Sequence, residues 1–173
     1  RCIQKDFSDM DAFEMDVNKR FENGEAFGKS QSPKGKAFKT KKGRTVYDGG
    51  GISPDVFIPL DTSNYTQLWS SLLEKGTIVD FADEFVNANK SVLLTKYSTQ
   101  NSFVSSFNLM EVFPDFKKYC EKNKITWNEK DYQKSEKIIN RYLFSQIGKK
   151  LFGQEAYIRV SNQFDPVIVK ALN

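Results

Sequence analysis

The sequence predicts a mainly helical α+β protein, with a few closing β-strands and one inserted helix followed by an all-helical C-terminal domain. Beyond residue 61, apolar residues recur at intervals of three and four, which is the period of an amphipathic helix. Before residue 61, short extended pieces are separated by turns rich in glycine and proline. These two observations divide the chain into predicted domains at residues 1–60 and 61–173.

The composition is that of a folded globular protein. Hydrophobic residues make up 39% of the 173 residues and charged residues 28%, while 15 Phe, 7 Tyr and 2 Trp supply large pieces of a core. The net charge of +4 arises from basic residues scattered among acidic ones. We therefore predict a weakly basic, solvated surface and no nucleic-acid partner. No apolar run reaches the length of a membrane-spanning helix.

The chain contains no histidine, and this excludes several mechanisms together. Ser-His-Asp triads, Cys-His pairs, His-ligated zinc and haem sites all require an imidazole. Chemistry by lysine, carboxylate, tyrosine or backbone groups is still allowed. Cys2 and Cys120 are too far apart in the sequence for a zinc knuckle or a CxxC pair. We expect buried or free thiols rather than a disulfide. The two cysteines do not distinguish an oxidising from a reducing compartment.

The first elements are short. Residues 1–4 are predicted to form a strand entered from upstream sequence, because the start has neither an initiator Met nor a signal-peptide core. A helix follows, since four apolar residues recur at intervals of three, four and four: Met10, Phe13, Val17 and Phe21. Gly24 is predicted to stop this helix, and residues 24–36 are predicted to be a mobile loop.

A hairpin is predicted next. Residues 37–40 and 44–47 are short extended pieces, and the Lys-Lys-Gly sequence between them suits a turn. Residues 52–60 are predicted to be extended again, with prolines where the donors of a strand ladder are missing.

Helices are predicted over most of the remaining chain. Apolar spacing predicts one helix over residues 65–73 and a second over residues 77–96. The polar residues 98–102 are predicted to break the second helix. A third helix is predicted over residues 109–119, where Pro114 either begins the helix or kinks it.

The last helices are marked by their caps. Asn128 is predicted to cap the longest helix, with Asp131 at its third position and Gly153 at its end. A short helix is predicted around residues 156–160, and the Asp165-Pro166 pair predicts the start of another.

One segment is far more specific than the others. Residues 43–56 read GRTVYDGGGISPDV, and three consecutive glycines permit a sharp bend between two strands. The segment lacks the GxxxxGK[ST] pattern of a phosphate-binding loop. It resembles the GR-x-VY-x-GGGI-x-PDV signature of carboxyl-terminal processing peptidases, also called tail-specific proteases. In that family a PSGR-x-IQ stretch precedes the signature, and residues 1–4, RCIQ, match its second half.

The positions that match these two motifs are Arg1, Ile3, Gln4, Gly43, Arg44, Val46, Tyr47, Gly49, Gly50, Gly51, Ile52, Pro54, Asp55 and Val56. The insertion between the motifs is similar to that of long family members from Bacteroidetes-like bacteria, and a fainter similarity continues through the helical tail.

The resemblance implies a periplasmic or cell-envelope serine endopeptidase that cleaves proteins near their C-termini. In the family a serine nucleophile is activated by a lysine, a pairing that needs no histidine. Both residues would lie upstream of Arg1, so we expect no catalytic residue, cofactor or metal ligand in this chain. Residues 1–60 would then be C-terminal strands and the inserted helix of the peptidase core, and residues 61–173 a helical module for substrate docking or assembly.

The partners implied by the resemblance are the upstream catalytic and PDZ-like segments of the same polypeptide and, as substrate, unfolded protein C-terminal tails. The sequence is also compatible with a homo-oligomer. The alternative from another class is an independent protein-interaction domain with no peptidase role. The histidine-free composition allows both hypotheses.

Other candidate sites have simpler explanations. Lys29 follows Phe-Gly, as the family's catalytic lysine does, but it comes after Gln4 instead of before Arg1. The acids Asp9, Asp11, Glu14 and Asp16 could suggest a metal site, yet acids at a helix start favour capping.

Two further groups are predicted to be structural. Aromatic residues at helical spacing could line a groove for a substrate tail but are more typical of a core: Tyr65, Trp69, Phe81 and Phe85. Lysines that could touch nucleic acid are predicted to lie on solvated faces: Lys117, Lys118, Lys122, Lys124, Lys149 and Lys150.

Overall fold

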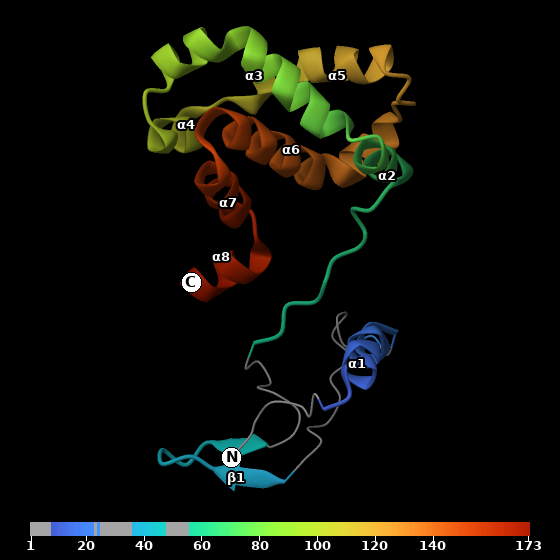
Figure 1. The fold of residues 1–173 in the computed structure, drawn as a ribbon, viewed down its shortest axis with the longest axis vertical. Coiled ribbons are helices and arrows are strands. Elements are labelled where there is room, and N and C mark those ends of the chain that lie inside the picture. Colours follow the sequence, from blue (N-terminus) through green and yellow to red (C-terminus); the bar gives the residue numbers. More distant parts are fainter. Residues whose placement is uncertain (1–7, 23, 25–35, 48–55) are drawn as a thin grey trace. The chain divides into compact units, whose positions relative to one another are not determined.

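The computed structural model describes residues 8–22, 24, 36–47 and 56–173, and the chain divides into two compact units (Figure 1). These units are Arg1–Asp61 and Thr62–Asn173. The described residues form helices and one two-stranded sheet, so the predicted mainly helical α+β class is confirmed. Within those residues, every helix is too short or too polar to cross a lipid bilayer.

The first unit contains one described helix, α1 (Met10–Glu22). Its start is stabilised by Asp9, whose Oδ1 accepts a hydrogen bond from the amide of Ala12 at 3.0 Å. Gly24 follows the helix with a φ of +77°, a conformation that favours glycine and explains the stop predicted there.

The predicted hairpin is present as β1 (Ala37–Lys39) and β2 (Thr45–Tyr47). The strands are antiparallel, with Phe38 opposite Val46. The turn is closed by the amide of Thr40, which donates to the carbonyl of Arg44 at 2.8 Å. Gly43 has a φ of +80° in this turn, so the Lys-Lys-Gly sequence supplies the residue that the turn needs.

The predicted extension over residues 52–60 is described only from residue 56. Residues 56–60 form no strand, because the described part of the chain offers them no neighbouring strand with which to pair. Pro59 also lacks the amide hydrogen that a strand ladder uses.

The second unit is helical throughout. Its elements are α2 (Gln67–Glu74), α3 (Thr77–Lys96), α4 (Gln100–Ser106), the 3₁₀ turn η2 (Leu109–Glu111), α5 (Phe113–Lys122), α6 (Glu129–Phe152), α7 (Gln154–Gln163) and α8 (Pro166–Leu172). Helix α6 contacts α2, α3, α4 and α7, and in Figure 1 it runs between α3 and α7. Residues 143–148 of α6 are all buried, so this helix is enclosed on every side over that stretch.

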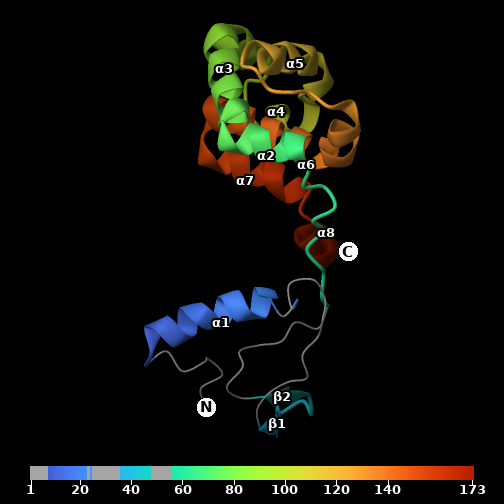
Figure 2. The ribbon, with the colours of Figure 1, turned by 90° about the vertical axis from the view of Figure 1, so that its right-hand side faces the viewer.

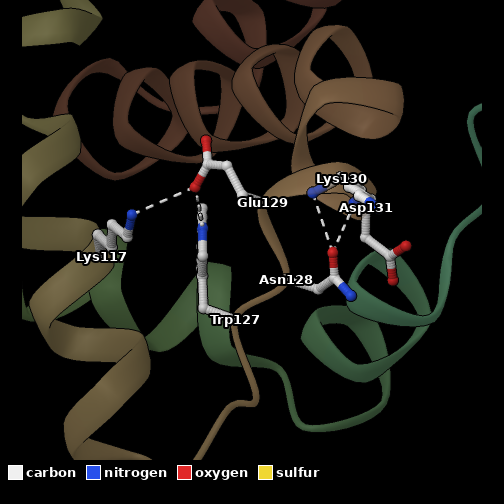
Figure 3. Close-up of polar contacts among 6 residues, drawn as sticks. All are labelled: Lys117, Trp127, Asn128, Glu129, Lys130 and Asp131. Atoms are coloured by element: carbon white, nitrogen blue, oxygen red, sulfur yellow. Dashed lines mark hydrogen bonds and ion pairs between the residues drawn. The ribbon is translucent and has the colours of Figure 1, made fainter.

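The ends of α6 are set by local chemistry. Oδ1 of Asn128 accepts hydrogen bonds from the amides of Lys130 and Asp131 at 2.9 and 3.2 Å, as predicted for an N-cap (Figure 3). Gly153 ends the helix with a φ of +88°. Asp165 caps α8 in the same way as Asn128 caps α6, by accepting from the amide of Val167 at 2.8 Å.

Several predicted boundaries differ from the structure. The segment predicted as one helix over residues 109–119 is divided into η2 and α5, because Pro114 has no amide hydrogen and fits only the first turn of α5. The residues predicted as a polar break contain the start of α4. Tyr65 lies before α2 and is exposed, and Leu73 on α2 is also exposed, so the predicted apolar stripe of that helix is narrower than its sequence spacing suggests.

Candidate functional site

The candidate site is an open groove of about 350 Å³ between α3 and α5. It is lined by Phe81, Glu84, Phe85, Ala88 and Asn89 of α3 and by Asp115, Lys118, Tyr119 and Lys122 of α5. On each helix these residues follow intervals of three and four, so each helix contributes one face. The two helices lie side by side in both views (Figures 1 and 2).

The helices run antiparallel. Just before α3 begins, Nζ of Lys75 donates to the carbonyl of Lys124, beyond the end of α5, at 3.2 Å. At the end of α3, Nζ of Lys96 lies 3.4 Å from a carboxylate oxygen of Glu111, before the start of α5. The groove therefore runs from the C-terminal end of α5 to its N-terminal end.

Aromatic rings form the floor of the groove. Phe81 is buried and stacks on Phe85, with ring centroids 5.7 Å apart and planes 18° from parallel. The edge of one ring meets the face of the other between Phe81 and Tyr119, at 5.4 Å, and between Phe81 and Phe116, at 5.2 Å. Such geometries stabilise aromatic pairs beyond the area that they bury. Each ring that lines the floor therefore packs against at least one other ring.

One hydrogen bond links the two walls of the groove. The phenol of Tyr119 donates a hydrogen bond to Oε1 of Glu84 at 3.1 Å. Burial raises the pKa of the Tyr119 phenol, and the hydrogen bond to Glu84 and its negative charge raise it further. Tyr119 is therefore a neutral hydrogen-bond donor at physiological pH, and it holds the Glu84 carboxylate beside the aromatic floor.

The charges along the groove are separated. Lys118 and Lys122 are exposed, and neither they nor Asp115 form an ion pair with any residue that the structure describes. Asp115 is in the first turn of α5 and Lys122 in its last turn. On the α5 wall the two lysines lie toward the C-terminal end and Asp115 toward the N-terminal end, whereas the α3 wall places the Glu84 carboxylate beside Tyr119.

A second polar cluster lies at the start of α6 (Figure 3). Oε2 of Glu129 accepts from Nε1 of Trp127 at 3.1 Å and lies 3.4 Å from Nζ of Lys117. The Lys117 ammonium also lies 5.3 Å from the centroid of the Trp127 ring. Each of these groups already has a partner inside the unit, so this cluster stabilises the fold rather than offering a binding site.

The matched motif is described only in part. Gly43, Arg44, Val46 and Tyr47 belong to the hairpin and its turn, and Val56 is exposed. The other motif positions lie outside the described residues: Arg1, Ile3, Gln4, Gly49, Gly50, Gly51, Ile52, Pro54 and Asp55. Lys29 also lies outside them, and so does Cys2.

The other predicted candidates are separated in space. Asp9 caps α1, and the described residues contain no group of three or more acids or cysteines placed to hold a metal ion. The aromatic set is split: Trp69 is buried against Tyr142 with centroids 5.8 Å apart, whereas Phe81 and Phe85 line the groove and Tyr65 is exposed.

The lysines weighed as a nucleic-acid surface have different surroundings. Lys117 pairs with Glu129, and Nζ of Lys150 lies 2.7 Å from Oδ1 of Asp83. Lys118 and Lys122 line the groove together with carboxylates. Sequence reasoning missed Glu84, Asp115 and Tyr119 as site residues. The available signal was the spacing of Asp115, Tyr119 and Lys122 on one face of α5.

The comparisons with known proteins concern the helical unit. Residues 68–153, from α2 to the C-cap of α6, match a family model described as a family of unknown function (DUF8443). No curated protein and no solved structure gives a significant match to the chain. All residues that line the groove lie inside the matched segment.

Proposed function

We propose that this chain is the C-terminal, non-catalytic portion of a Ser-Lys serine endopeptidase of the tail-specific family, which cleaves proteins near their C-termini. One observation carries the proposal: residues 43–56 follow the family signature, and residues 1–4 match the motif that precedes it in the family. The order of the two motifs makes a chance agreement of both improbable. The catalytic serine and lysine are expected upstream of Arg1, in a periplasmic or envelope protein.

In this proposal the first unit completes the peptidase core. The hairpin of β1 and β2 is a two-stranded sheet with three residues in each strand, and its side chains are exposed or half-buried. A hairpin of this size is marginally stable alone and gains stability by pairing with further strands. Upstream strands of the peptidase core would provide that pairing.

The helical unit would serve substrate docking or assembly. It has a continuous hydrophobic core that includes Leu72, Phe103, Phe116, Ile139 and Leu143, all 2% exposed or less. A unit with its own core can act as a module attached to a catalytic domain. The groove between α3 and α5 supports a binding role for it.

The alternative is an independent protein-interaction domain. It is favoured by the match of residues 68–153, which lies wholly within Thr62–Asn173 and includes none of the peptidase-like motif. This alternative explains the groove equally well, but it leaves the signature at residues 43–56 unexplained.

The test is a complementation assay. Hydrolysis of an unfolded reporter protein is measured with the chain alone, with an upstream segment that supplies the serine and lysine, and with the two mixed. We expect cleavage only in the mixture. A Gly50→Val variant, which alters the signature, should abolish complementation, whereas the groove variant Lys118→Glu/Lys122→Glu should still restore cleavage of this generic reporter.

The other outcomes separate the hypotheses. Cleavage by the chain alone would contradict a non-catalytic portion and would make Lys29 the first residue to test. If the mixture did not cleave the reporter although both segments were shown to be folded, the hypothesis of an independent protein-interaction domain would be favoured.

A further inference from the structure

We propose that the groove between α3 and α5 binds a short amphipathic helix of another protein, with acidic side chains beside one end of its apolar stripe. The argument uses only residues of Thr62–Asn173. It therefore stands whether or not the chain is part of a peptidase.

The shape of the groove fits a helix. Its walls are single faces of two antiparallel helices, and a third helix laid between them would complete a three-helix arrangement. From Phe81 to Asn89 the α3 wall is about 12 Å long, at about 1.5 Å per residue. The bound segment is therefore short, between two and three helical turns.

The floor provides the apolar contact. Phe85 is half-buried and Ala88 is exposed, so both present apolar surface that a ligand can cover. The Phe85 ring is held by its stacking on Phe81, which is itself fixed by Phe116 and Tyr119. Because these rings are already ordered, a ligand that packs on them loses little side-chain entropy.

The charges specify the ligand. Lys118 and Lys122 are four residues apart on α5, so they lie one turn apart on the same face. The neighbouring Lys117 is paired with Glu129, whereas Lys118 and Lys122 have no ion pair among the described residues. Two such ammonium groups attract carboxylates on the side of the ligand that faces α5, whereas Glu84 on the α3 wall disfavours them on the side that faces α3. Asp115 at the other end favours a basic or neutral residue there, which sets the direction of the ligand.

A nucleic acid fits this groove less well. Phosphates occur at every nucleotide and would meet the carboxylates of Glu84 and Asp115, which line the same groove. A peptide helix can place its acids only on the side that faces Lys118 and Lys122 and keep the side that faces Glu84 free of them. The mixed charge therefore favours a peptide over a phosphate backbone.

The test begins with a peptide selection. A library of random displayed peptides is selected on the immobilised chain, and in parallel on a groove variant, Lys118→Glu/Lys122→Glu. The matched control is Lys130→Glu/Lys134→Glu, because these two lysines are also exposed and four residues apart, but lie on α6 outside the groove. Circular dichroism and thermal unfolding check that each variant is folded.

We expect the wild-type chain and the α6 control to enrich peptides with apolar residues at intervals of three and four and with Asp or Glu beside one end. A synthetic copy of such a peptide should bind the groove variant about tenfold more weakly in fluorescence anisotropy, since two attractive charges become repulsive. Its affinity for the wild-type chain should fall as salt rises.

Any of three results with the displayed peptides would overturn the proposal. These are no enriched peptide, enriched peptides without an excess of acids, or binding that the groove variant does not weaken. Groove-dependent binding of an RNA or DNA oligonucleotide in place of the peptides would also overturn it. If the double variant does not fold, Ala88→Gln tests the same site, because it places a longer uncharged side chain in the groove.

Discussion

The phenol of Tyr119 on α5 and the carboxylate of Glu84 on α3 are joined by a hydrogen bond of 3.1 Å across the candidate groove. The pKa of Tyr119 is raised first by burial and then by Glu84, because ionising the phenol would remove the donor and place two negative charges side by side. The bond therefore couples the protonation of Tyr119 to the packing of α3 against α5.

The first prediction concerns this pair. Glu84→Gln should lower the pKa of Tyr119 toward its ordinary value of about 10 while leaving it raised by burial. The titration of Tyr119 is obtained as the ultraviolet difference between each protein and its Tyr119→Phe counterpart. An unchanged midpoint in Glu84→Gln would show that the carboxylate does not interact with the phenol in solution.

The same pair predicts that the free energy of unfolding falls at high pH. Because the folded pKa lies above the unfolded value, the folded state retains a proton that the unfolded state releases. This contribution is fully present below pH of about 10 and is lost as pH rises through the folded pKa. The loss should be smaller in Glu84→Gln, as measured by urea unfolding above pH of about 10.

The second prediction concerns Gly148 on α6. A Cβ at this position would lie 3.0 Å from Cε1 of Phe103, which is fully buried. The Phe103 ring cannot move away, because it is enclosed by other rings: Tyr97, Phe107, Phe144 and Phe152. Alanine favours a helix by about 1 kcal/mol over glycine, but overpacking a core costs about 1–3 kcal/mol.

We therefore expect Gly148→Ala to lower the free energy of unfolding by about 1 kcal/mol. In a Phe103→Leu background the added methyl has more room, and the same substitution should be neutral or stabilising. A double-mutant cycle by urea unfolding measures this coupling. Equal effects in the two backgrounds would show that Phe103 is not what excludes a side chain at this position.

Much of the helical unit could be predicted because its signals are local. Helix α3 has the bounds that apolar spacing and Gly76 predict, and Asn128 and Asp165 cap α6 and α8 as predicted. A cap is a contact between residues two or three apart, so sequence alone contains it. The hairpin turn at Gly43 was predictable for the same reason.

Helix α4 was missed because its sequence is polar and short. It begins with a capping box between Thr99 and Ser102, and this local signal could have revealed it. Its single fully buried side chain, Phe103, gives no period from which a helix could be predicted.

The candidate groove could not be predicted from the sequence. Glu84 and Tyr119 belong to different helices, and their contact depends on how α3 and α5 pack. Periodicity predicts that Phe81 and Phe85 face inward, but it does not predict that the second ring lies at the edge of the core.

The third prediction concerns the thiol of Cys120. Burial, with a smaller contribution from the charge of Glu121, raises its pKa to about 12. At pH of about 8 only roughly one thiol in ten thousand is then ionised. We expect Cys120 to resist iodoacetamide in the folded chain and to react in urea.

Mass spectrometry of digested protein separates Cys120 from Cys2, and a Cys2→Ser variant provides a chain with one cysteine. Modification of Cys120 in native buffer as fast as in urea would contradict its burial in the core.

The fourth prediction concerns a pair of hydroxyl groups, on Thr66 and Ser135, that joins the start of α2 to α6. Ser135 is fully buried, and its hydroxyl donates to the carbonyl of Asn64 at 2.7 Å. Its oxygen also lies 2.6 Å from Oγ1 of Thr66, which accepts a hydrogen bond from the amide of Trp69 at the start of α2. Since Ser135 has one hydrogen and gives it to Asn64, the hydroxyl of Thr66 must donate to Ser135.

Ser135→Ala should therefore lower the free energy of unfolding by about 1–3 kcal/mol, because the half-buried hydroxyl of Thr66 loses its acceptor. Thr66→Ala should cost about 1 kcal/mol through the loss of the cap of α2. The two losses share one hydrogen bond, so the double variant should be less destabilised than their sum. Urea unfolding followed by tryptophan fluorescence measures this, because Trp69 and Trp127 are the two tryptophans of the chain and both lie in Thr62–Asn173.

Ser105→Ala is the matched control for the serine change. The hydroxyl of Ser105 is exposed and bonds back to the carbonyl of Asn101 on its own helix, so its removal should change stability by about 0.5 kcal/mol or less. If Ser135→Ala were as mild as this control, or if its effect and that of Thr66→Ala simply added, the hydroxyl pair would not be what fixes the start of α2 on α6. A larger, non-additive loss would show that the position of α2 depends on this polar contact as well as on the apolar packing of Leu68 and Leu72.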